Sequence, residues 1–196
     1  MILYSYQMEN IFFDLNKLKH RGNNVIIGKT VRIRYPELVS IGDNSIIDDF
    51  TYISTGFEIS NNVHICAGCK IIGGRNAFVY MGEYSTIAPN VVLAAGSDDY
   101  IGGIATPFVP IEFKGDVKIG NIKIEKHCIV GSNSVVLPNV ILNEGAVVGA
   151  LSLVNKNLDY WCLYAGVPAR KIRKRNKEQI LALEEKLLAS RGKLLK

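Results

Sequence analysis

The feature that most constrains the fold of this chain is an aliphatic residue at every sixth position. The first unbroken run is Ile41, Ile47, Ile53, Ile59, Ile65 and Ile71. The second is Ile124, Val130, Val136, Leu142, Val148 and Val154. A helix repeats every 3.6 residues and an ordinary strand every two, so steps of six fit neither. They are typical of short strands joined by tight bends, in which three units close one three-sided coil and successive coils stack with parallel strands.

Small residues and turn formers occupy the positions that such a coil requires. A small or β-branched residue stands four positions after many of the aliphatic ones: Ser45, Thr51, Val63, Cys69, Ser85, Val91, Cys128, Ser134, Val140, Ala146 and Ser152. The pairs Gly42–Asp43 and Asn61–Asn62 fall where the bends are expected, and these residue types accept backbone conformations that most side chains resist. The sequence therefore predicts an all-β chain, a parallel β-helix of hexapeptide repeats.

The ladders and the tail segment "GALSLVNKNLDYWCLYAGVPARKIRKR" resemble the hexapeptide-repeat acyltransferases, whose domain is a left-handed parallel β-helix. The resemblance covers about residues 24–173. The front end and the stretch "SDDYIGGIATPFVP" look most like the branch that acylates dTDP-linked amino-dideoxy sugars such as dTDP-4-amino-4,6-dideoxyglucose. The resemblance implies an acetyl-CoA-dependent N-acetyltransferase of surface polysaccharide (O-antigen) biosynthesis, assembled as a homotrimer with active sites between subunits.

The chain of 196 residues is long enough for one good core, and its interruptions divide it into regions. We expect an N-terminal cap at residues 1–23 and the β-helix at 24–169. The long gap between Leu93 and Ile124 predicts a projecting loop at 97–118. The remaining residues, 170–196, hold 10 Lys/Arg against 3 Asp/Glu. They predict a basic C-terminal helix with Glu184 near lysines, covering the open end of the solenoid or a neighbouring subunit.

The candidate catalytic residues are His64, Asp98 and Asp99. Many relatives use a His just before the loop, and this sequence has Asp98 there instead. An ordinary carboxylate is a weak base at neutral pH, whereas an amine is a good nucleophile once neutral, so the difference favours an amino acceptor. His64 is either a general base or an interface histidine. Asp98 and Asp99 could orient that base, hold the substrate amine, or cap a turn.

The resemblance also implies where the coenzyme binds. Ser132 and Ala150 would present backbone groups to the pantetheine of acetyl-CoA. The residues that would approach the nucleotide phosphates are Asn155, Lys156, Arg170 and Arg173. The basic excess that begins at Arg170 supports a phosphate site independently, because guanidinium groups bind phosphate oxygens in forked geometry. The alternative for these residues is a solvated helix cap.

The sequence disfavours membrane-spanning, secreted, nucleic-acid-binding and metal-binding proteins. No apolar run approaches the roughly 20 residues of a membrane span, and the start does not resemble a secretory signal, which favours a cytoplasmic protein. The basic tail lacks interleaved aromatics, which disfavours nucleic acid as a partner. "CAGC" at 66–69 is a lone CxxC, so four reduced thiols without a metal are expected.

Two alternatives stay open. One is a sugar O-acetyltransferase of the same family. The other is a metal-dependent β-helix hydratase or a scaffold, which would need about three converging histidines. The sequence holds His20, His64 and His127, which are not spaced to converge within one chain. His20 is expected at the surface and His127 to be structural.

Overall fold

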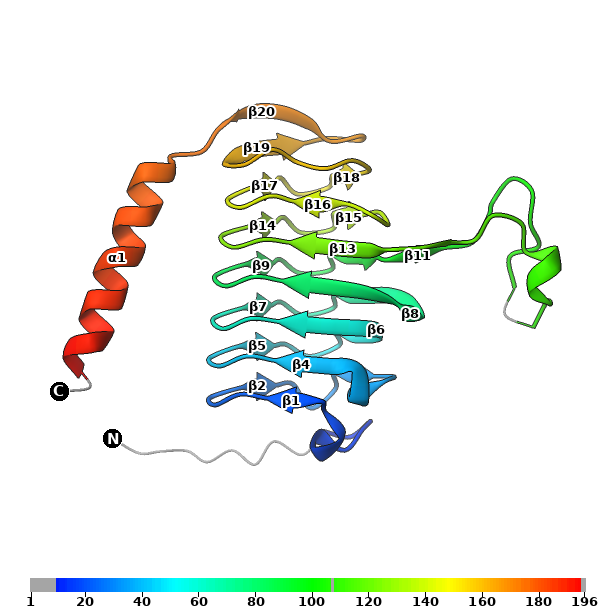
Figure 1. Ribbon diagram of the computed structural model, residues 1–196, viewed down its shortest axis with the longest axis horizontal. Helices are drawn as coiled ribbons and strands as arrows, with labels where there is room; N and C mark the ends of the chain where they lie inside the picture. Colours follow the sequence, from blue (N-terminus) through cyan, green and yellow to red (C-terminus); the bar gives the residue numbers. More distant parts are fainter. Residues whose placement is uncertain (1–9, 107, 195–196) are drawn as a thin grey trace.

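The computed structural model describes residues 10–106 and 108–194, and within them the chain is a left-handed parallel β-helix with three faces (Figure 1). One face comprises β3 (Arg32–Ile33), the start of β6 (Tyr52–Ile59), the start of β8 (Lys70–Met81), β10 (Val92–Ala94), β15 (Val135–Val136) and β18 (Leu153–Val154). The second comprises β1 (His20–Arg21), β4 (Val39–Ile41), the ends of β6 and β8, β13 (Asn121–Ile124) and β16 (Ile141–Leu142).

The third face is an eight-stranded sheet. Its strands are β2 (Ile26–Ile27), β5 (Ile46–Ile47), β7 (His64–Ile65), β9 (Thr86–Ile87), β14 (Ile129–Val130), β17 (Val147–Val148), β19 (Cys162–Ala165) and β20 (Arg170–Lys174). All its pairings are parallel except that of β19 with β20, which is antiparallel.

The six-residue ladder builds the core as predicted. Each ladder residue pairs with the equivalent residue one coil away, so that Ile47, Ile65 and Ile87 form one column of side chains with no exposed surface. The small residues at the fourth position, such as Ser45 and Cys69, are also buried at the bends. Burial of these columns supplies the hydrophobic stabilisation that a chain without a conventional layered core needs.

The bends use left-handed backbone conformations. Six asparagines have φ between 53° and 63°: Asn24, Asn44, Asn62, Asn90, Asn133 and Asn139. Asparagine tolerates this region better than most residues because its short amide can bond locally. At the corner of Asn24, Asn44 and Asn62, the later coils hold Tyr84, His127, Gly145 and Trp161.

The interruptions of the repeat gather at one corner. The extra residues around Glu37 and those around Arg75 touch through an ion pair of 2.8 Å. The short helix η2 (Pro36–Leu38) lies in the first of these segments. From the same corner the predicted loop projects away from the solenoid (Figure 1). Its base is the antiparallel pair β11 (Gly96–Ser97) and β12 (Lys118–Ile119), and it carries the helix η3 (Ile111–Phe113).

Two boundaries differ from the predicted ones. β1 already pairs with β4, so the solenoid begins at His20 rather than at residue 24. The segment before it, with η1 (Leu15–Lys17), packs Phe13 and Leu18 against the core. Residues 1–9 of the predicted cap, residue 107 of the predicted loop and residues 195–196 of the predicted helix lie outside the described ranges.

The prediction of a helix from residue 170 is wrong in its first part. Residues Arg170–Lys174 form β20, because the backbone edge of β19 is satisfied by a returning strand. The helix α1 spans Lys177–Leu194, and the side chain of Asn176 accepts a hydrogen bond from the Gln179 N–H as its N-cap. It does not cover the open end, because Glu184 holds it against the side of the solenoid (Figure 1). No helix in the described ranges is long and apolar enough to span a bilayer.

Candidate active site

One edge of the solenoid brings together residues from most of the coils. It consists of the residues that directly follow the inward side chains of the eight-stranded sheet: Gly28, Asp48, Cys66, Ala88, Gly131, Gly149 and Ala165. We call this set the edge column. Because neighbouring strands lie about 4.8 Å apart, Cys66 is roughly 10 Å from Gly131 along it.

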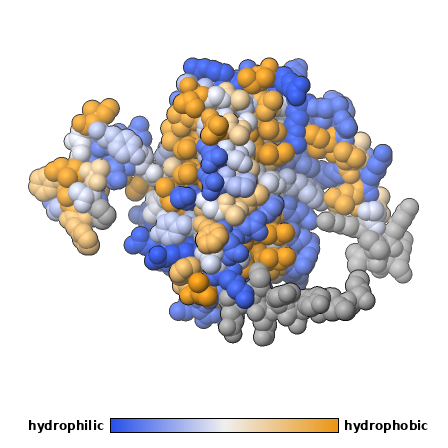
Figure 2. Space-filling model, turned by 180° about the vertical axis from the view of Figure 1, so that it is seen from behind, coloured by the Kyte–Doolittle hydropathy of each residue, from blue (hydrophilic) through white to orange (hydrophobic). Residues whose placement is uncertain are grey.

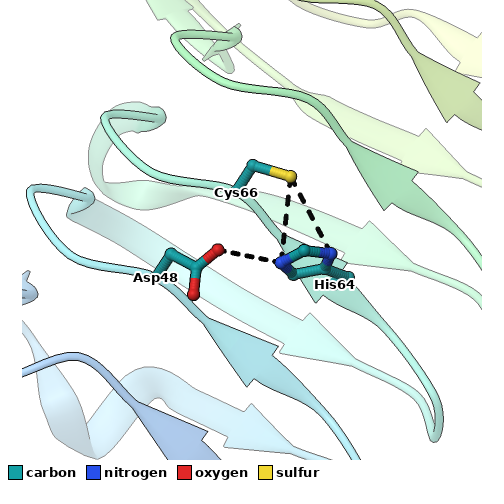
Figure 3. A group of neighbouring side chains, drawn as sticks. All are labelled: Asp48, His64 and Cys66. Atoms are coloured by element: carbon teal, nitrogen blue, oxygen red, sulfur yellow. Dashed lines mark hydrogen bonds and ion pairs between the residues drawn. The ribbon is translucent and has the colours of Figure 1, made fainter.

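Near one end of the edge column, Asp48 and Cys66 form a polar cluster with the neighbouring His64 (Figure 3). His64 Nε2 lies 2.9 Å from Asp48 Oδ2, and Cys66 Sγ lies 3.8 Å from both ring nitrogens. The side chains of His64 and Asp48 are 42% and 43% exposed, so ligands from solution can reach them. As predicted, His64 points away from the core.

The two cysteines of "CAGC" have different environments. Cys69 is fully buried at a small-residue position, and burial raises its pKa to about 12. Cys66 is half-buried on the outer surface, where burial and the neighbouring charge of Asp48 raise the pKa of its thiol. The motif therefore does not present two sulfurs to one ligand.

The two loop aspartates also differ. The carboxylate of Asp99 accepts hydrogen bonds from the backbone N–H groups of Ile101, Gly102 and Asp116. These bonds hold the pKa of Asp99 below its usual range. Asp99 thus closes the loop on itself, which is the turn-capping alternative raised by the sequence.

Asp98 instead lines an open depression of about 380 Å³ at the base of the loop, between Gly73 and Lys118. Among the described residues its carboxylate has no hydrogen-bond partner, so it is available to a substrate. It lies at the corner where the loop leaves β10, whereas His64 lies on the eight-stranded sheet. Within one chain these two predicted catalytic residues do not form a common site.

The residues predicted for the coenzyme occupy two neighbouring edges. Ser132 and Ala150 stand next to the edge column in successive coils, and the Leu151 N–H bonds to the Ser132 carbonyl at 2.9 Å. A side chain on Gly131 would meet the Ala150 nitrogen at 2.5 Å, so only glycine permits this close stacking. Arg170 pairs with Ala165 at the end of the same column.

The other three predicted coenzyme residues lie apart from that edge. Arg173 is opposite Leu163 on β20, nearer the next edge. Asn155 and Lys156 are exposed at the bend after β18. The structure therefore groups Ser132, Ala150 and Arg170, and places Asn155, Lys156 and Arg173 away from them.

An aromatic stack at the opposite edge was missed by sequence reasoning. The rings of Tyr84 and His127 stack at 5.4 Å, and His127 and Trp161 are 5.8 Å apart. His127 is buried, and its Nε2 bonds to Glu184 of α1 at 2.8 Å, so it is structural as predicted. Arg175 lies over Trp161 and donates to the His127 carbonyl at 2.6 Å. His20 is exposed on β1, as expected, so the three histidines do not converge within this chain.

Comparison with known proteins gives a consistent picture. No protein-family model matches the chain. It is 36% identical over 170 residues to the dTDP-4-amino-4,6-dideoxy-D-glucose acyltransferase of Escherichia coli, covering 85% of this chain and 86% of that protein. The structure matches AntD, an N-acyltransferase from Bacillus cereus solved with dTDP and 3-hydroxybutyryl-CoA. That match has a TM-score of 0.86 at 35% identity and covers 93% of this chain and 99% of the other.

A variant of AntD solved with dTDP-4-amino-4,6-dideoxyglucose and coenzyme A matches at a TM-score of 0.85 and 35% identity, covering 92% and 98% of the two chains.

Proposed function

Because the chain belongs to the hexapeptide-repeat acyltransferases that include the dTDP-4-amino-4,6-dideoxy-D-glucose acyltransferase of Escherichia coli, we propose that it transfers the acetyl group of acetyl-CoA to the amino group of a dTDP-linked amino-dideoxy sugar. The observation that carries the proposal is agreement over nearly the whole length with an N-acyltransferase solved with dTDP and an acyl-CoA. The product would serve surface polysaccharide biosynthesis, including that of O-antigen.

Asp98 is the residue that we assign to the acceptor. Its carboxylate faces an open depression and, among the described residues, has no bond that a substrate would have to break. A carboxylate there can hold the sugar ammonium and orient the amine as it loses its proton. Asp99 positions Asp98 by closing the loop, through its three backbone hydrogen bonds.

The reaction needs little help from a protein base. The neutral amine nitrogen attacks the thioester carbonyl carbon, the carbon–nitrogen bond forms, and the carbon–sulfur bond breaks. The coenzyme A thiolate leaves, and the proton lost from nitrogen can neutralise it. Backbone N–H groups of an edge without bulky side chains can stabilise the developing oxyanion.

For the donor, we assign Ser132, Ala150 and Arg170 to one acetyl-CoA molecule lying along the edge column. Gly131 and Gly149 leave backbone groups accessible there, and Arg170 stands at the end of the column where phosphates could be bound. Asn155, Lys156 and Arg173 would contact the nucleotide end from the neighbouring edge. The free state of all four cysteines fits the cytoplasm, where both substrates would be met.

A homotrimer would complete the site. The loop tip carries exposed apolar side chains, with Ile101 99% and Phe108 100% exposed, and Figure 2 shows hydrophobic residues gathered on this projection. The eight-stranded sheet also turns Ile26 and Ile129 outward. Exposed apolar surface of this kind is typical of subunit contacts. In such an assembly the loop of one subunit could bring its Asp98 to the edge column of another.

The alternative acceptor is a sugar hydroxyl. A hydroxyl needs a base, and His64, oriented by Asp48, is the one histidine that the described residues place beside the edge column. Under the N-transfer proposal His64→Ala retains activity, whereas under O-transfer it abolishes it.

The test is release of coenzyme A from acetyl-CoA, measured with a thiol reagent against a panel of dTDP-linked amino sugars and their hydroxyl counterparts, and corrected for the thiols of the protein. We expect turnover with amino sugars alone and a loss of about 100-fold or more in kcat/KM for Asp98→Asn. Glu112→Gln changes an exposed carboxylate on the same loop and is the matched control, so it should leave kcat/KM unchanged. Absence of turnover with every amino sugar would overturn the proposal.

Two further points can be checked alongside. Light scattering should give three times the chain mass of 21.6 kDa. Replacing acetyl-CoA by 3-hydroxybutyryl-CoA tests which acyl group is accepted.

A further inference from the structure

We propose that Asp48, His64 and Cys66 form a binding site for a divalent transition metal of the zinc class. The cluster combines a carboxylate, an imidazole and a thiol whose ligand atoms all lie within 4.8 Å of one another. Imidazole with thiolate selects zinc and its neighbours over magnesium or calcium, which prefer oxygen ligands alone.

The fold itself makes these three side chains converge. His64 and Cys66 stand on either side of the inward residue Ile65, so both side chains project from the same surface (Figure 3). Asp48 precedes Cys66 by 18 residues, the length of one coil here, and therefore lies beside it in the adjacent coil. The site is thus built on a rigid stack of strands and not on a loop.

The distances suit a tetrahedral ion. Zinc bonds of about 2.0 Å to nitrogen and oxygen and about 2.3 Å to sulfur place neighbouring ligand atoms roughly 3.3–3.6 Å apart. The present separations are 2.9 Å between His64 Nε2 and Asp48 Oδ2 and 3.8 Å between His64 Nε2 and Cys66 Sγ. The third separation, between the Asp48 carboxylate and Cys66 Sγ, lies within 4.8 Å, so closing it takes a movement of up to about 1–1.5 Å, which rotation of these partly exposed side chains can supply.

A fourth position stays open. In the next coil, Thr86 and Ala88 occupy the places of His64 and Cys66, and neither side chain is long enough to cover the cluster. His64 and Asp48 are each more than two-fifths exposed. Three protein ligands with one open position are the arrangement of zinc sites that accept an exogenous ligand.

The fold does not depend on the cluster. The coils are held by backbone pairing and by buried columns such as that of Ile65, whereas a partly exposed pair such as Asp48 and His64 contributes little to stability. Within the described ranges, the side-chain hydrogen bonds of Asp48, His64 and Cys66 are made only to one another. Cys69 is excluded from the site because its sulfur bonds inward to the Ala88 carbonyl.

The experiment titrates untagged, chelator-treated protein with Co²⁺ and then displaces the cobalt with Zn²⁺. We expect one equivalent of Co²⁺ per chain, intense visible bands of a tetrahedral ion and a near-ultraviolet thiolate-to-cobalt charge-transfer band that Zn²⁺ abolishes. Cys66→Ser should remove the charge-transfer band. His64→Gln and Asp48→Asn should each weaken binding by at least about tenfold.

His20→Gln is the matched control, since His20 is an exposed histidine on another face, and it should leave the titration unchanged. Persistence of the charge-transfer band in Cys66→Ser, or undiminished binding in His64→Gln or Asp48→Asn, would overturn the site. So would one metal per three chains, because the three ligands lie in one chain. Circular dichroism of each variant shows that the fold is retained, and acyl transfer does not enter the result.

Discussion

Replacing Gly145 by alanine should destabilise this protein far more than the same change at Gly74. Both glycines have left-handed backbones, with φ of 72° and 78°. A Cβ on Gly74 would meet nothing within 4 Å, whereas one on Gly145 would lie 2.3 Å from Cδ2 and 2.4 Å from Cε3 of the Trp161 ring. The pair therefore separates the cost of backbone strain from the cost of a steric clash.

The magnitudes follow from these contacts. Strain in the left-handed region costs an alanine about 1–2 kcal/mol, partly offset by the smaller entropy of the unfolded chain. Carbon atoms normally stay about 3.5–4.0 Å apart, so the Trp161 ring must move by more than about 1 Å. That movement overpacks its pocket, at about 1–3 kcal/mol, and loosens its contacts with His127 and Arg175, at about 1–2 kcal/mol together. Gly145→Ala should thus cost about 3–5 kcal/mol and Gly74→Ala about 1 kcal/mol.

Thermal unfolding at fixed protein concentration is the assay, because any subunit association makes Tm concentration-dependent. At about 2–4 °C per kcal/mol for a chain of this size, Tm should fall by roughly 6–20 °C for Gly145→Ala and by about 2–4 °C for Gly74→Ala. In a Trp161→Ala background the ring is gone, and the effect of Gly145→Ala should shrink to that of Gly74→Ala. Equal shifts for the two glycine variants in the native background would refute the reasoning.

Three further outcomes are expected. The carboxylate of Asp99 has a lowered pKa, so its contribution to loop closure is complete above about pH 4 and is lost as the pH falls through the lower, folded value. The hydrogen-exchange protection factors of the amides it binds, which correct for the intrinsic pH dependence of exchange, should therefore fall in acid, and in Asp99→Asn already at neutral pH. A maleimide should label one thiol per native chain, more slowly than a free cysteine because the pKa of Cys66 is raised, and Cys66→Ser should abolish labelling. Burial raises the pKa of Glu184, but its bonds to Lys126 and His127 outweigh that effect and leave the pKa lowered. Limited proteolysis of α1 should therefore increase below about pH 4 and in Glu184→Gln. Labelling of two thiols would contradict the assignment of Cys66, and an α1 equally resistant in Glu184→Gln would contradict that of Glu184.

Much of the fold could be predicted because the residues of each hexapeptide determine its local conformation. The aliphatic side chain fixes which residue points inward, and the asparagines and glycines fix the bends, so the interior and the projecting loop follow from local patterns. The coenzyme residues next to Gly131 and Gly149 were likewise indicated by resemblance, and their roles remain predictions.

What could not be predicted depends on contacts between coils. Asp48 meets Cys66 because one coil contains 18 residues at that point, and the pairing becomes visible only when the two coils are laid side by side. Tyr84 and His127 are separated by the whole projecting loop, so their stacking has no local signal. The start of α1 was misplaced because the basic run at Arg170 has no strand pattern of its own and becomes a strand only against the free edge of β19.

The reversed direction of β20 has a consequence for solubility. A stack of parallel coils has no intrinsic length limit, and an uncovered last coil would invite another molecule to continue it into a filament. β20 runs the opposite way and is exposed along its whole length, with four cationic side chains among its five residues. The strands of a second solenoid could not continue the parallel pairing at β20, and its own cationic strand would be repelled there. The terminal strand therefore disfavours head-to-tail association.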